Sequence, residues 1–183
     1  AICHLHSLEV FHLDLKLDNM MMGLDGTVKI IDFGLSTRDA TKRKMPPFGT
    51  EGYTPPEAHR GEMCDPKLAD LWMLGICIYA LQFKRMPFRN AVKGDPWFDY
   101  FLQRGVFTRP GDDPVGGCMV AMFAAWLQPD ASRRVCTAFM VYQPIVLLPP
   151  HSSLEVKALA YASRIAASAK SNSSECPTPV VAT

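Results

Sequence analysis

The sequence predicts a mainly α-helical fold that contains one small β-hairpin. The stretch from Pro66 to Phe83 is apolar almost all round, which is typical of a helix in the middle of a core. Asp25 and Gly26 stand between two short apolar runs, at 20–22 and 27–31, and Asp-Gly in this setting is a strong hairpin signal. Three further segments have the pattern of helices, namely residues 95–103, 118–127 and 135–142.

The first half of the chain adds one helix and one long loop to this prediction. Ile2, Leu5 and Leu8 follow helical spacing, which predicts the last turns of a helix over residues 1–9. Residues 36–56 are polar, basic and rich in Pro and Gly, without periodicity, so we expect a long loop of the kind that is usually functional. The basic run at 42–44 is expected to be a solvated face of that loop, and recruitment of an acidic partner is the alternative.

The character of the sequence changes after residue 143. Ser152 and Glu155 form a capping box ahead of a predicted helix over 152–170, and the Ser/Pro/Thr-rich residues 171–183 are predicted to be disordered. We therefore predict a main domain over residues 1–143 and a C-terminal extension over 144–183. In one interpretation, the predicted helix of this extension regulates the main domain or binds a partner. In the other, the extension packs loosely, or is translated sequence that belongs to no folded domain.

Composition excludes several classes of protein. The chain has 183 residues with 19 Lys and Arg against 18 Asp and Glu, a formal charge of +1, which argues against a nucleic-acid binder that works through basic excess. The longest apolar run is too short for a membrane span, and nothing resembles a secretion signal. The six cysteines form no C-x-x-C pair and no disulfide-type spacing, so we expect reduced thiols and a cytoplasmic location, with the nucleus as the alternative.

The stretch from His12 to Gly34 carries the candidate chemistry. Asp14 and Asp32 flank the predicted hairpin, and a hairpin returns the chain to where it left, so both carboxylates should reach one edge of the sheet. One carboxylate could orient or deprotonate an attacking hydroxyl. The other, together with the amide oxygen of Asn19, suits Mg²⁺, and Lys16 could neutralise charge on a moving phosphoryl group. The alternative is that both acids merely cap local backbone.

The same residues resemble the signature motifs of eukaryotic protein kinases. Residues 12–19 (HLDLKLDN) resemble the catalytic loop of that family, and Asp32-Phe33-Gly34 resembles its metal-binding triplet. Further resemblances follow in family order over roughly residues 1–143: Gly49-Thr50-x-x-Tyr53, Pro55-Pro56-Glu57, Asp70-x-Trp72-x-x-Gly75 and Asp130-Ala131-Ser132-Arg133-Arg134. The resemblance implies the larger, C-terminal lobe of a kinase fold, and ATP- and Mg²⁺-dependent transfer of phosphate to protein serine or threonine.

The resemblance also implies a role for each site residue. Asp14 would be the catalytic base or hydroxyl orienter, Lys16 would contact the transferring phosphate, and Asn19 and Asp32 would hold Mg²⁺. The combination of Lys16 and Thr50 resembles the serine/threonine branch. Structural support would come from the residues His12, Phe33, Gly34, Glu57, Asp70 and Arg134, of which Glu57 and Arg134 resemble the buried ion pair of the family, and Asp70 would accept backbone hydrogen bonds from the catalytic loop.

Three features concern regulation and specificity. Leu13 stands where many kinases have an Arg that pairs with a phosphate, so we expect that phosphorylation of Thr37, Thr41 or Thr50 does not switch the site through position 13. Asp18, where basic-directed kinases often carry Glu, favours substrates with Arg near the target hydroxyl. Ala80 argues against this preference, because some such kinases have a second acid there.

No G-x-G-x-x-G occurs in the sequence, and no upstream Lys-Glu pair precedes the catalytic loop. We therefore expect that the N-terminal lobe is absent and that the isolated polypeptide has negligible activity. Two alternatives remain, a pseudokinase that serves as a binding scaffold, and a truncated product that occupies kinase partners through a helical face. The pair His4 and His6 is expected to have packing or surface roles, because residues two apart on a helix do not face each other.

Overall fold

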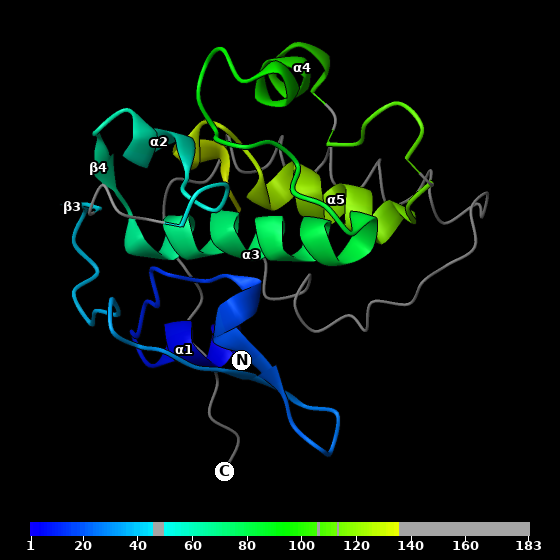
Figure 1. Ribbon diagram of the computed structural model, residues 1–183. Coiled ribbons are helices and arrows are strands. Elements are labelled where there is room, and N and C mark those ends of the chain that lie inside the picture. The colour runs from blue at the N-terminus through cyan, green and yellow to red at the C-terminus, as the bar shows by residue number, and fades with distance from the viewer. Residues whose placement is uncertain (46–49, 106, 113, 136–183) are drawn as a thin grey trace.

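Helix α3, Pro66–Phe83, runs through the middle of the computed structural model (Figure 1). Helices α4, Pro96–Arg104, and α5, Gly117–Trp126, lie on one side of it, and helix α1, Ile2–Ser7, lies on the other with strands β1 and β2. The structure describes residues 1–45, 50–105, 107–112 and 114–135. The predicted helices at 135–142 and 152–170, the predicted disorder at 171–183 and the domain boundary at 143 fall outside these residues.

Helix α3 forms as the apolar pattern predicts, and its ends are set by local chemistry. The Asp65 carboxylate accepts hydrogen bonds from the backbone N–H groups of Lys67 and Leu68, and Pro66 occupies the first helical position. Lys84 closes the helix in the left-handed conformation with φ of 56°. Most of its residues are buried, among them Trp72, Ile76 and Tyr79, none of which has any exposed surface. The helix is therefore the centre of the core.

Helix α4 uses the same pair of signals as α3. Asp95 accepts hydrogen bonds from the N–H groups of Trp97 and Phe98, and Pro96 follows it. Its inner face adds Phe98 and Phe101 to an aromatic cluster around Phe88, with ring centroids 5.2 and 5.9 Å away. The predicted helices at 95–103 and 118–127 are thus present, each displaced by one residue at its ends.

The predicted hairpin is confirmed. Strand β1, Met20–Met22, pairs antiparallel with β2, Val28–Ile30, with Met20 opposite Ile30. Gly23 donates its N–H to the Thr27 carbonyl at 2.8 Å, and Gly26 has a φ of 78°, which only glycine adopts without strain. Ile31 and Asp32 follow the end of the hairpin.

The long-loop prediction for residues 36–56 is incomplete. Two residues of it form strand β3, Arg43–Lys44, which pairs antiparallel with β4, Met63–Cys64, after the short helix α2, Pro56–His59. Thr37 also exchanges two backbone hydrogen bonds with Phe11, both 2.9 Å long. A two-residue strand has no detectable periodicity, and its partner lies beyond the next helix, so the local pattern could not reveal this pairing. The basic run at 42–44 is exposed, as expected.

Two buried cysteines of the described residues agree with the expectation of reduced thiols. Cys64 and Cys77 are 1% exposed and form no disulfide. Burial raises the pKa of the Cys64 thiol to about 11 and that of Cys77 to about 12, which makes both unreactive at neutral pH. None of the helices in the described ranges combines the length and apolar character that a membrane crossing requires.

Substitution of Gly75 by alanine is expected to lower the free energy of unfolding by about 1–3 kcal/mol, although alanine is the better helix former. A Cβ at position 75 would lie 2.7 Å from Cδ2 and 3.0 Å from Cγ of Leu127, a fully buried side chain. Urea unfolding of Gly75→Ala measures the effect. The double variant Gly75→Ala/Leu127→Ala should cost less than the sum of its parts, because the clash is gone. A single variant as stable as the parent would contradict this packing.

Candidate active site

The carboxylate of Asp70, a residue of helix α3, holds the loop that carries Asp14 in place. Asp70 is fully buried, and its Oδ2 accepts the backbone N–H of His12 at 2.8 Å while its Oδ1 accepts that of Leu13 at 2.7 Å. These are the backbone hydrogen bonds that the sequence led us to expect from Asp70. Leu13 has a φ of 63°, an unusual conformation for a branched residue, and the two hydrogen bonds hold it there.

His12 joins this loop to the segment that carries Asp32. Its Nδ1 accepts the backbone N–H of Asp14 at 3.2 Å, so Nε2 carries the proton and donates to the carbonyl of Ile31 at 3.0 Å. Ile31 also donates its own N–H to the Asn19 carbonyl at 3.0 Å. Because Asp32 directly follows Ile31, the folded-back hairpin brings the segments of both acids to one edge.

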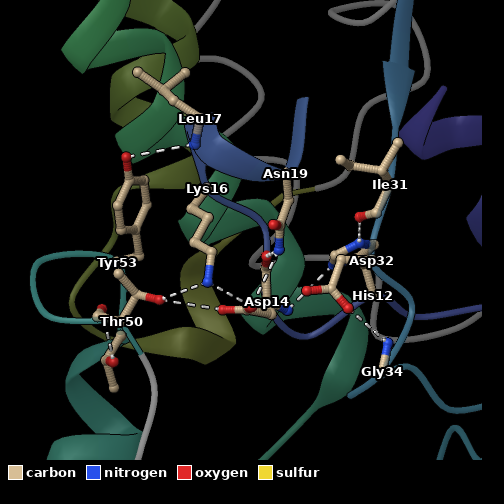
Figure 2. A network of polar contacts seen from close by, with 11 residues as sticks. His12, Asp14, Lys16, Leu17, Asn19, Ile31, Asp32, Gly34, Thr50 and Tyr53 are labelled. Atoms are coloured by element: carbon tan, nitrogen blue, oxygen red, sulfur yellow. Dashed lines mark hydrogen bonds and ion pairs between the residues drawn. The ribbon is translucent and has the colours of Figure 1, made fainter. Parts of the chain in front are cut away.

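The Asp14 carboxylate is the centre of a compact polar network (Figure 2). Its Oδ2 accepts hydrogen bonds from the Lys16 ammonium at 2.9 Å and from the Asn19 amide nitrogen at 3.1 Å. Its Oδ1 accepts the Thr50 hydroxyl at 3.3 Å, and that hydroxyl accepts a hydrogen bond from Lys16 at 3.1 Å. The side chains of Asp14 and Lys16 are 15% and 21% exposed, so the pair is largely shielded but reachable from solvent.

The surroundings of Lys16 keep it protonated. The hydrogen bond to Asp14 raises the pKa of the ammonium above its usual value, against an opposing effect of desolvation. The negative charges of Asp14, Asp18 and Asp32 raise it further. A fixed positive charge therefore stands beside the Asp14 carboxylate, where it can attract an anionic group.

Asn19 and Asp32 have the donor atoms for a hard cation. Asn19 uses its amide nitrogen for Asp14, and Asp32 uses Oδ1 to accept the N–H of Gly34 at 3.2 Å. Within the described part of the chain, the Asn19 amide oxygen and the Asp32 Oδ2 make no hydrogen bond. These two oxygens fit Mg²⁺, which usually keeps waters and phosphates as its other ligands. The described residues contain no cluster of three His, Cys, Asp or Glu side chains that could hold a metal by themselves.

Comparison with known proteins decides the family. The family model described as "Protein kinase domain" matches residues 1–136. The chain belongs to the protein kinase family. It is 41% identical over 91 residues to the probable serine/threonine-protein kinase mkcF of Dictyostelium discoideum, 41% over 111 residues to the serine/threonine-protein kinase ksp1 of Schizosaccharomyces pombe, and 40% over 90 residues to Aurora kinase A-B of Xenopus laevis.

These matches place the chain among serine/threonine protein kinases, as the motifs indicate. They cover 50%, 56% and 49% of this chain, and 13%, 23% and 22% of the three relatives, respectively. The chain thus spans less than a quarter of the length of each of these relatives. Its fold is that of a protein kinase domain, and the residues that the structure describes form helices and two small antiparallel sheets.

The chain also contains the ion pair between Glu57 and Arg134 that the family resemblance implies. The two guanidinium nitrogens of Arg134 donate to the two carboxylate oxygens of Glu57 at 2.5 and 2.6 Å, with both residues under 5% exposed. Arg134 also donates to the carbonyls of Gln128 at 2.8 Å and Leu68 at 3.2 Å, and its guanidinium lies 4.8 Å from the Trp72 ring centre. The pair therefore ties α2 to the central helix and to the turn after α5.

The remaining residues singled out from the sequence lie around this network. The ring of Phe33 meets that of His12 edge to face at 5.1 Å, and Phe33 is 43% exposed. Gly34 donates to Asp32, as described above. Asp18 is exposed in the 3₁₀ turn η1, Leu17–Asn19. Its negative charge contributes to raising the pKa of Lys16 and that of Tyr53.

The sequence did not reveal the contacts of His6. Its Nε2 lies 2.8 Å from Oδ2 of Asp70, the same oxygen that accepts the N–H of His12, and its side chain is 5% exposed. Its ring lies 5.5 Å from that of Phe11. The expectation of a packing role was correct but too general, because His6 joins α1 to the carboxylate that supports the catalytic loop. Nothing in the local sequence signals a partner so far along the chain.

Proposed function

We propose that this chain is the C-terminal lobe of a protein serine/threonine kinase, whose reaction is ATP- and Mg²⁺-dependent phosphoryl transfer to serine or threonine hydroxyls of proteins. The observation that carries the proposal is the hydrogen-bonded group of Asp14, Lys16, Asn19 and Thr50. It combines a proton acceptor, a fixed cation and an amide oxygen at one edge of the domain. That combination suits transfer of a charged group to a hydroxyl.

In this proposal Asp14 orients the substrate hydroxyl and takes its proton as the oxygen attacks. Asn19 and Thr50 fix the carboxylate from two sides, so that it needs no reorientation. Lys16 provides a positive charge where negative charge on the phosphoryl oxygens must be balanced. Its raised pKa supports this role, because the ammonium remains charged across the physiological range.

Asn19 and Asp32 would hold the metal through their unengaged oxygens. When bound, Mg²⁺ would neutralise charge on the phosphates of the nucleotide. The carboxylate of Asp32 is exposed at the end of the hairpin, where a solvated metal–nucleotide complex can approach it. His12 and Asp70 would act only as positioning residues, since both bind backbone groups of the loop.

The serine/threonine assignment has two supports. Thr50 connects Lys16 and Asp14 directly, and the relatives ksp1 and mkcF carry this activity in their names. Arg-directed specificity is the finer proposal, supported by the exposed carboxylate of Asp18 and opposed by the buried, uncharged Ala80. An intracellular, cytoplasmic or nuclear, location is part of the same proposal, with no role for nucleic acid.

Phosphate transfer by two polypeptides tests the proposal. We expect negligible transfer from ATP to peptides by the 183-residue chain alone, because it has no glycine-rich phosphate loop. A fusion that places the preceding kinase sequence of Aurora kinase A-B ahead of Ala1 should phosphorylate serine and threonine peptides but not matched tyrosine peptides. A folded fusion that binds ATP and transfers nothing would refute the enzymatic proposal.

A second candidate function, that of a pseudokinase scaffold, is favoured by Leu13, where many kinases have Arg. Melting of the fusion with ATP and Mg²⁺ separates the two. An active enzyme gives both nucleotide stabilisation, about 2.7 kcal/mol at a hundred times Kd, and turnover. A scaffold gives binding to partner proteins without turnover.

A further inference from the structure

Leu13 is the residue before the proposed catalytic acid, and it has an apolar environment. It is 5% exposed and belongs to a small core cluster with Phe11, 5% exposed, and Ala69 of α3, fully buried. Met45, which follows strand β3, packs against this cluster and also against the main core. The side chain therefore joins three separate segments, the catalytic loop, the central helix and the loop after Asp32.

Backbone contacts of the residues that precede Met45 reinforce this junction. Phe11 and Thr37 exchange two hydrogen bonds, which attach the start of the segment after Gly34 to the base of the catalytic loop. Arg43 and Lys44 of β3 pair with Cys64 and Met63 of β4. This pairing attaches the residues before Met45 to the chain beyond α2. Met45 follows Lys44 directly, so the pairing of β3 with β4 places Met45 next to the cluster of Phe11, Leu13 and Ala69.

Charge at this place would be unfavourable. Leu13, Phe11 and Ala69 offer no hydrogen bond to a phosphate, and a charged group placed among them would be desolvated without a partner. The four cations of the segment, namely Arg38, Lys42, Arg43 and Lys44, are all exposed. A phosphate on Thr41 would therefore meet solvated cations of its own segment rather than the catalytic loop.

We propose that the contact of Met45 with the Leu13 cluster holds the segment from Thr37 to Met45 against the catalytic loop, so that its placement requires no phosphate. Leu13 is in this sense a positioning residue. It takes over by burial of apolar surface what an arginine–phosphate pair would do by charge. The regulatory meaning of the contact rests on the proposed kinase function, whereas the contact itself does not.

Hydrogen exchange measured by mass spectrometry on the 183-residue chain, without nucleotide, tests the proposal. Leu13→Ala and Met45→Gln should each speed exchange of the amides in residues 43–45 and 63–64 by about tenfold or more, while α3 keeps its protection. The matched control is Leu35→Ala, the same change at a side chain that is 46% exposed and lies two residues before the segment, and it should leave exchange unchanged. The effect of combining Leu13→Ala with Met45→Gln should be smaller than the sum of the two single effects, because the two variants share the contact of Met45 with the Leu13 cluster.

The outcomes separate the proposal from its rivals. Unchanged exchange at 43–45 in Met45→Gln, with α3 still protected, overturns it. If Leu13→Ala loses α3 protection and thus unfolds, Met45→Gln decides by itself, since it removes only the side chain that the segment contributes. In the parent chain Thr41→Glu should not slow exchange at 43–45, and slowing by tenfold would overturn the independence from phosphate. None of these readouts uses catalysis, so failure of the kinase assay leaves them interpretable.

Discussion

Arg134→Met is expected to lower the free energy of unfolding by about 3–5 kcal/mol, because it leaves the Glu57 carboxylate buried without a partner. Glu57 is 2% exposed, and both of its oxygens depend on the guanidinium of Arg134. The substitution also leaves the carbonyls of Gln128 and Leu68 without the hydrogen bonds that Arg134 donates. Chemical denaturation followed by circular dichroism measures the loss.

The neighbouring residue provides the control for this prediction. Arg133 is exposed, so Arg133→Met makes the same chemical change and should alter stability by at most about 0.5 kcal/mol. The double variant Glu57→Leu/Arg134→Met should recover part of the loss, since an apolar pair of similar volume carries no unpaired charge. If Arg134→Met were as stable as Arg133→Met, the ion pair would not stabilise the packing of α2 on the central helix.

Asp14→Asn is expected to lower kcat of the active fusion by about 10²- to 10⁴-fold, the usual contribution of a general base. Asparagine has nearly the same shape, so it can keep a contact with Lys16 and Thr50, but it cannot take up the proton of a hydroxyl. The KM for the peptide should therefore change little. Steady-state rates of peptide phosphorylation with saturating ATP measure the effect.

Glu9→Gln is the matched control, because it is the same carboxylate-to-amide change at an exposed position on the edge of the same domain. It should leave kcat unchanged. The melting temperature of Asp14→Asn should stay close to that of the parent, which separates a chemical defect from a folding defect. Full activity in a correctly folded Asp14→Asn would remove Asp14 from the reaction and favour the scaffold function.

Local sequence was sufficient wherever a feature depends on neighbouring residues. The hairpin follows from Asp25 and Gly26 between apolar runs, since the turn requires a positive φ that Gly26 has. Helix α3 follows from its apolar stretch and from Asp65-Pro66, which supply a cap and a first turn. The motifs that contain Asp14, Lys16, Asn19 and Asp32 resemble those of protein kinases, and the match to the protein kinase family confirms that resemblance.

Only the folded chain decided the contacts between distant segments. The pairing of β3 with β4, the approach of His6 to Asp70 and the packing of Met45 on the Leu13 cluster join residues that no local pattern relates. The physical reason is that one polar atom or one apolar surface can be satisfied by many partners along the chain. Which partner it meets depends on how α1, α3 and the loop after Asp32 pack together, and that is a property of the whole core.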